Sequence, residues 1–207
     1  MKSDAVAFGI AGIAFGLIAG WVIGTEQARG GSGGAAAGVA PAAAAPATPA
    51  SAPPVVLDQA QVTALTSVAE REPSNPRPRV DLANLYFDAD RYDDAIKWYG
   101  DALKLNPNDV NVSTDLGVSY YYTNQPDKAL DQFAHSLKLE PRHLKTLLNQ
   151  GIVRAFGKQD LDGAILSWQQ VIALAPDSPE GQAAKRALDT LQSAHPSTGA
   201  SATRPGG

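Results

Sequence analysis

The sequence predicts an all-α fold: a solenoid of helical hairpins with three repeats and capping helices, preceded by a transmembrane helix and an Ala/Pro/Gly linker. Three observations predict this fold. A pattern of small and large apolar residues returns every 34 or 35 residues, a proline closes each period, and 19 uncharged residues stand near the N-terminus. The expected boundaries are a flank at 1–5, a membrane helix at 6–24, a linker at 25–55, a repeat domain at 56–194 and a tail at 195–207.

The composition excludes several classes of site. The 207 residues carry a formal net charge of -4, which argues against a nucleic-acid-binding protein because such proteins usually present a basic face. The chain has no cysteine, so it has no disulfide, no thiolate metal site and no cysteine nucleophile.

The first apolar segment runs from Val6 to Gly24 without a charged residue. As a helix it would span about 28 Å, close to the thickness of the hydrocarbon core of a bilayer. Trp21 near its end suits the lipid headgroup region. A cleaved signal peptide is the alternative, with cleavage near Ala35 to Ala37, but the apolar run is longer than is usual for one.

Four glycines recur every four residues in this segment and would share one helix face, which lets a second helix approach closely. They are Gly12, Gly16, Gly20 and Gly24. This face could form a homo-oligomer, although small residues are common in membrane helices. Lys2 and the terminal amine slightly favour a cytoplasmic N-terminus, which would place the repeats outside the cytoplasm, on the periplasmic side.

The linker is too poor in bulky side chains to order itself. Residues 30–54 contain 11 Ala, 5 Pro and 5 Gly, and no charge. Such a segment cannot offset its conformational entropy, so we expect disorder there and in the Ser/Thr/Gly/Pro-rich tail at 195–207. The linker would hold the repeat domain away from the membrane surface.

The repeats are expected at about 76–107, 110–141 and 144–176, each made of two amphipathic helices. In the first, a turn at 88–91 precedes a second helix from Tyr92 to Leu105. The extra residue of the third repeat is expected in a turn from Phe156 to Asp162. The prolines that end the periods are Pro107, Pro141 and Pro176.

Both ends of the repeat array carry a predicted capping helix. Residues 58–72 take the place of a second helix from a truncated preceding repeat. At the other end, Ser178 and Pro179 start a helix over 179–193 with an apolar stripe on one side. Neither helix of a pair can bury its apolar face alone, so the units must stack.

These motifs resemble the tetratricopeptide repeat (TPR) family, over about residues 76–176. The third repeat departs from the pattern, with Gln150 and Arg154 in place of Leu and Tyr, which we expect to weaken its packing. The resemblance implies a concave groove that binds a peptide or a partner protein. The groove residues it implies are Asn84, Phe87, Asp88, Asp115, Val118, Tyr121, Tyr122, Lys145, Asn149, Ile152 and Phe156.

Two aspects of this groove can be argued further. Only Asn84 and Lys145 match the five-residue clamp with which some family members bind a terminal carboxylate, so the sequence argues against that activity. Asp88 and Asp115 instead predict an acidic groove that favours a basic or amphipathic ligand. Alternatively, the helix after Ser178 covers part of the apolar row and makes it core.

No catalytic or metal site is predicted, and no cofactor. His135, His143 and His195 lack the spacing of metal ligands, and the acid pairs Asp93/Asp94 and Asp160/Asp162 are explained by helix starts. We therefore expect a non-enzymatic, membrane-anchored scaffold, similar to bacterial single-span repeat proteins. One alternative is a periplasmic assembly or cytochrome c maturation accessory factor. A second is a membrane oligomer organised by the glycine face, and a third is catalysis hidden in the groove.

Overall fold

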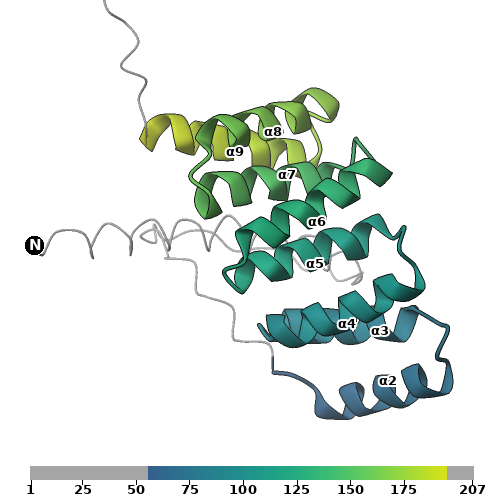
Figure 1. The fold of residues 1–207 in the computed structure, drawn as a ribbon. Coiled ribbons are helices and arrows are strands. Elements are labelled where there is room, and N and C mark those ends of the chain that lie inside the picture. Colours follow the sequence, from purple (N-terminus) through teal and green to yellow (C-terminus); the bar gives the residue numbers. More distant parts are fainter. Residues whose placement is uncertain (1–55, 195–207) are drawn as a thin grey trace, which may run out of the picture.

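The computed structural model describes residues 56–194, and this part of the chain is entirely helical (Figure 1). Its elements are α2 (Gln59–Arg71), α3 (Arg77–Asp88), α4 (Tyr92–Leu105), α5 (Val110–Tyr122), α6 (Pro126–Leu139), α7 (Leu144–Ile152), a π-helical turn η2 (Val153–Gly157), α8 (Leu161–Leu174) and α9 (Pro179–Ala194). The all-helical prediction is confirmed for these residues, among which there is no strand.

The predicted membrane segment 6–24, its four glycines, the linker and the tail lie outside the described residues. None of the helices within 56–194 is both long enough and apolar enough to cross a bilayer.

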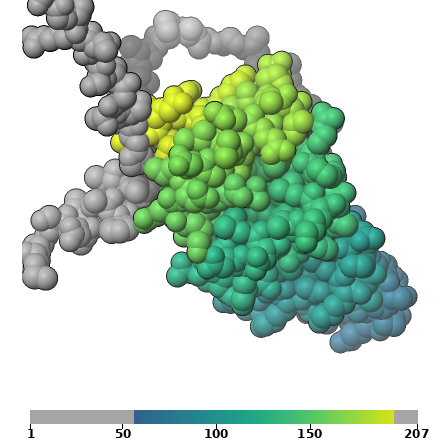
Figure 2. All heavy atoms as spheres, turned by 45° about the horizontal axis from the view of Figure 1, so that its top comes forward, coloured from purple at the N-terminus to yellow at the C-terminus, as the bar shows by residue number. Residues whose placement is uncertain are grey.

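The helices pack as successive antiparallel pairs. α3 pairs with α4, α5 with α6 and α7 with α8, while α2 packs on α3 and α9 packs on both α8 and α7. Figure 1 shows the pairs stacked in chain order, and the space-filling view in Figure 2 shows a continuous stack from α2 to α9. Each pair therefore buries its apolar face against its neighbours, as expected of a solenoid.

Close approach of paired helices depends on small residues that face large ones. The ring of Phe133 lies against Gly117, and the indole of Trp168 lies against Gly151. Phe133 and Trp168 are both fully buried. Ala83 and Ala95 have the same role between α3 and α4, where they pack with Tyr99.

The turn inside each hairpin repeats the same backbone geometry. Asp90, Asn124 and Gln159 each adopt a left-handed conformation, with φ between 57° and 59°. The next residue in each turn donates its backbone N–H to a carbonyl near the end of the preceding helix, as from Arg91 to Tyr86 at 2.8 Å. This closing pattern satisfies carbonyl groups that the helix leaves unpaired.

The third hairpin corrects one prediction. Phe156 and Gly157 were expected in a turn, but both belong to η2, which continues α7 with a wider helical turn. The Lys158 N–H donates to the Val153 carbonyl five residues back, at 3.1 Å. The extra residue is accommodated within the helix because a π-helical turn keeps its backbone groups hydrogen-bonded, whereas an added loop residue would leave them exposed.

Candidate protein-binding groove

The predicted groove residues come from the first helix of each hairpin, on α3, α5 and α7 with η2. α5 contacts α7, and α7 contacts α9. The structure brings the predicted residues together in three parts: a polar centre, an aromatic row and an apolar pocket at the α9 end.

The polar centre contains an ion pair between two neighbouring repeats. The Lys145 ammonium lies 2.9 Å from Asp115 Oδ1, and both side chains are about three-quarters buried, with 22% and 24% exposed. The Lys145 charge offsets that of Asp115, one of the two acids on which the prediction of an acidic groove rested. Spacing within one repeat could not predict this ion pair, because the two residues are 30 positions apart in the chain and belong to different repeats.

Asn84 lies at the base of the same region. The buried Tyr99 hydroxyl donates a hydrogen bond to Asn84 Oδ1 at 2.6 Å. Burial raises the pKa of Tyr99, and the negative charges of Asp115 and Asp88 raise it further. The Tyr99 hydroxyl therefore stays protonated and acts as a hydrogen-bond donor.

Three predicted groove residues are core rather than surface: Val118, Asn149 and Ile152. Val118 is 4% exposed and packs with Phe133 and Val153, while Asn149 is 6% exposed and donates to the Lys145 carbonyl at 2.9 Å. The stacking of successive hairpins covers them, because the first helix of each repeat packs on those beside it. The side chains of Val118 and Asn149 are not available to a ligand in this structure.

The aromatic row is formed by Phe87, Tyr92, Tyr121 and Tyr122, from the ends of α3 and α5 and the start of α4. Tyr92 and Tyr122 stack with ring centroids 4.5 Å apart, and Phe87 meets the edge or face of both at 5.2 and 6.0 Å. Tyr121 lies 6.0 Å from Tyr122. Such contacts stabilise a rigid aromatic surface.

Burial raises the pKa of the tyrosine hydroxyls in this row. Burial and the charge of Asp90 raise the pKa of Tyr122 to about 12, and burial likewise raises the pKa of Tyr121. Tyr92 donates to Asp90 Oδ1 at 2.5 Å. Sequence reasoning missed Tyr92 because it starts a second helix, and its pairing with Tyr122 crosses from one repeat to the next.

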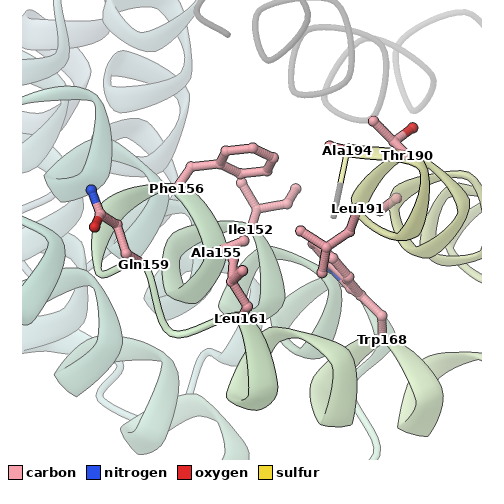
Figure 3. A pocket seen from close by; sticks show the side chains of 10 residues that line it. Ile152, Ala155, Phe156, Gln159, Leu161, Trp168, Thr190, Leu191 and Ala194 are labelled. Carbon is pink, nitrogen blue, oxygen red and sulfur yellow. The ribbon is translucent and has the colours of Figure 1, made fainter. Parts of the chain in front are cut away.

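The apolar pocket lies at the α9 end of the groove and has a volume of about 430 Å³. It is lined by Ile152, Ala155, Phe156, Gln159, Leu161, Trp168, Ala187, Thr190, Leu191 and Ala194. Figure 3 shows Phe156 and Ile152 facing Leu191 and Thr190 of α9 across the opening, with Leu161 and Trp168 below. The pocket therefore joins η2 and α7 to α8 and α9.

The terminal helix α9 covers only part of the predicted apolar groove positions, which include Ile152 and Phe156. Ile152, a predicted groove residue, is 3% exposed and packs in one cluster with Leu191 and Trp168, whereas Phe156 stays 43% exposed. The alternative that α9 turns this row into core therefore holds at Ile152 and fails at Phe156. The apolar stripe of α9 could be found from the sequence, but the space it leaves could not.

Both histidines within residues 56–194 hydrogen-bond to neighbouring groups of the repeats. His135 is exposed and lies 3.2 Å from the Pro107 carbonyl, and His143 bridges Thr146 and Asn111. Within residues 56–194, no three His, Asp or Glu side chains are arranged to hold a metal ion.

Comparisons with known proteins agree with this architecture. A family model described as TPR repeat matches residues 83–124, and one described as tetratricopeptide repeat matches residues 114–179. No curated protein sequence gives a significant match.

Solved structures share the fold at low sequence identity. A crystal structure of MamA is 17% identical with a TM-score of 0.52, covering 64% of this chain and 88% of that chain. The first TPR domain of Spaghetti (RPAP3), bound to the HSP90 peptide SRMEEVD, is 21% identical with a TM-score of 0.51, covering 67% and 95%. The Arabidopsis OM64 TPR domain is 15% identical with a TM-score of 0.51, covering 56% and 95%.

Proposed function

Because the chain belongs to the tetratricopeptide repeat family, we propose that it is a non-enzymatic scaffold that holds a peptide or a partner protein in its concave groove. The observation that carries the proposal is the continuity of the aromatic row with the apolar pocket. A Cβ atom at Gly157 would lie 3.2 Å from the Tyr121 ring and 2.9 Å from Pro126, so η2 lies beside the row. Tyr121 also packs against the cluster that contains the pocket residues Ile152 and Ala155.

This surface has the composition of a protein-recognition site. Half-buried aromatic side chains provide contact area at low entropic cost, and the Asp115–Lys145 pair beside them offers both charges to a polar ligand group. A similar fold holds a peptide in the Spaghetti (RPAP3) structure. The Asp115–Lys145 pair favours an amphipathic ligand over a purely basic one.

Site-specific photo-crosslinking tests the location of the partner. A photoreactive phenylalanine analogue is placed in cells at Tyr121 or Phe156 in the groove, and at Ala134 or Gln169 as matched exposed positions on the second helices α6 and α8. We expect protein adducts from the groove positions only. Equal adducts from both pairs would contradict a groove function.

The absence of catalysis is tested separately at the polar centre. We expect a variant with both Lys145→Ala and Asp115→Ala to bind the crosslinked partner more weakly while releasing no altered product. Chemical change of the partner by the native chain, lost in this variant, would show by mass spectrometry and would contradict a scaffold.

We also propose that residues 6–24 anchor this scaffold in a membrane, with the repeats outside the cytoplasm. Support comes from the uncharged length of that segment. A phosphatase fused after Gly207 should be active in the membrane fraction, and a fluorescent protein that matures only inside the cell should stay dark. Fluorescence at the membrane would reverse the orientation, and soluble phosphatase would indicate cleavage.

The glycine face of this segment predicts a second role, oligomerisation in the membrane, which can be tested separately from the groove. Replacing Gly16 and Gly20 with leucine should abolish any oligomer formed through the membrane helix but leave groove crosslinks intact. Loss of crosslinks together with the oligomer would mean that assembly, rather than the groove, captures the partner.

A further inference from the structure

The pocket at the α9 end is built by a local departure from the repeat. Counting four residues forward from the small residue that faces the second helix gives Phe87 in the first repeat and Tyr121 in the second. The same count from Gly151 gives Ala155. The aromatic side chain of the third repeat is Phe156, one residue later.

The extra residue in η2 explains this shift. Counting back three residues from the left-handed turn residues Asp90, Asn124 and Gln159 gives Phe87, Tyr121 and Phe156. The aromatic residue thus stays three positions before the turn residue in every repeat. Because the third repeat has one more residue, the position four residues after its small residue is an alanine, whereas the other repeats have an aromatic ring there. Ala155 is 4% exposed and lines the pocket, and Phe156 stands at its opening.

The opposite wall is also short of side-chain volume. α9 contributes Ala187 and Ala194 beside Leu191 and Thr190. The resulting volume of about 430 Å³ falls in the range of ligand pockets, roughly 300–1,000 Å³, and is well above the ~150 Å³ that holds one benzene ring. It can hold the whole side chain of a Leu, Met, Phe or Trp residue.

The chemistry of the lining selects the occupant. None of the ten lining residues is charged, and only Gln159 and Thr190 are polar. A carboxylate or an ammonium group would lose its hydration here without gaining a charged partner, so its burial in the pocket would be unfavourable. An uncharged apolar side chain gains by burial.

The rest of the chain offers few occupants of this kind. Residues 25–55 contain no apolar side chain larger than valine, and residues 195–207 contain none larger than proline. Segment 6–24 has larger ones, but the proposed function assigns it to the bilayer. The pocket is also continuous with the aromatic row through Tyr121 and Gly157.

From these observations we propose that this pocket is the anchor site for one bulky, uncharged apolar side chain of the partner peptide. The inference rests on the proposed groove function and sharpens it. The aromatic row and the Asp115–Lys145 pair contact the rest of the peptide, and the pocket fixes its register by taking the anchor side chain.

The test uses the full chain in lipid nanodiscs and a phage-displayed library of random dodecapeptides. Thr190→Trp fills the opening from an exposed position on α9, and Ala194→Trp is a second filling variant. Gln192→Trp is the matched control, because it is exposed on the same helix and points away from the pocket by helical periodicity. Circular dichroism establishes that each variant is folded.

We expect the enriched peptides to share one large apolar residue. Changing it to alanine, or introducing either filling variant, should weaken binding at least tenfold, while Gln192→Trp leaves affinity unchanged. The methyl resonance of Ile152, assigned by Ile152→Val, should shift on addition of the native peptide and not of its alanine version.

Other results would overturn the inference in distinguishable ways. Peptides that bind without a shared apolar residue, or with affinity insensitive to both filling variants, would remove the anchor site and leave the groove function standing. The absence of any enriched peptide, together with no groove crosslinks, would remove both. A dimer abolished by Thr190→Trp would assign the pocket to a second copy, and peptide binding seen only after removal of 6–24 would assign it to that segment.

Discussion

Replacing Gly151 with alanine should destabilise the protein, whereas the same replacement at Gly100 should stabilise it. Both glycines lie within helices, α7 and α4, and both replacements remove the conformational cost of a helical glycine, about 1 kcal/mol. Around Gly100 an added methyl group meets nothing within 4 Å. That variant should gain the full amount.

At Gly151 the added methyl group would enter the indole of Trp168, where two ring carbons would lie at 2.6 and 2.8 Å. Trp168 has no exposed surface, and its Nε1–H donates to the Leu148 carbonyl at 3.2 Å, so it cannot move without losing packing or that bond. Overpacking of this kind costs about 1–3 kcal/mol. The net change is a loss of up to about 2 kcal/mol, because the gain in helix propensity offsets part of it.

Comparing the two variants isolates the packing term, since the helix-propensity gain is common to both. The unfolding free energies should differ by about 1–3 kcal/mol, measured by urea titration with far-ultraviolet circular dichroism on the full chain in mild detergent. Equal stabilities, or a Gly151→Ala variant more stable than Gly100→Ala, would refute the view that a small residue at this position permits the close helix crossing.

Three further predictions follow from the described contacts. The free energy of unfolding should fall between pH 10 and 12. Tyr122 has a pKa of about 12 in the folded protein and 10.0 in the unfolded chain, so over this range it stays protonated when folded and ionises when unfolded. Chemical denaturation at a series of pH values should show a shallower fall for the Tyr122→Phe variant. Asp160→Ala should cost about 1 kcal/mol of stability in urea titration, because Asp160 Oδ1 accepts the Gly163 N–H at 2.9 Å at the start of α8; an unchanged midpoint would show that water replaces this cap. A double-mutant cycle of Lys145→Ala and Asp115→Ala should give a coupling of about 0.5–1 kcal/mol that shrinks at high salt, and additive effects would show that the pair contributes no net stability.

The parts of the fold that the sequence predicts are those that recur. The second helix of the first repeat, Tyr92–Leu105, has the expected bounds, and the capping role of Ser178 is confirmed by its side-chain oxygen, which accepts the Gly181 N–H. Such features depend on local rules that each repeat obeys separately, namely apolar period, caps and prolines.

The candidate site is harder to predict because it depends on contacts between repeats. The Asp115–Lys145 pair and the Tyr92–Tyr122 stack each join side chains from different hairpins. Whether a groove position is open or covered also depends on the curvature of the stack, which is why Val118 was expected at the surface and lies in the core. Sequence spacing identifies the helix face but does not give that curvature.

The departures from the repeat pattern show how the chain keeps the fold while changing the surface. At the same position of the first helix, Arg79 donates to the Asn75 and Ala69 carbonyls and so ties α3 to α2. Ser113 instead accepts from Gln132 and Ser136 in a buried hydroxyl network.

In the third repeat the polar departures are also bonded rather than left as defects. Arg154 donates to the Gly163 carbonyl at 3.1 Å, and the Ser167 hydroxyl donates to Gln150 at 3.3 Å. These bonds tie α8 to η2 and to α7. A repeat held together by such bonds needs no large apolar residue at the place of Arg154, and it can accept the extra residue of η2 without losing the crossing at Gly151. The departures of the third repeat from the family pattern are therefore hydrogen-bonded, and the close helix crossing at Gly151 is kept beside the extra residue of η2.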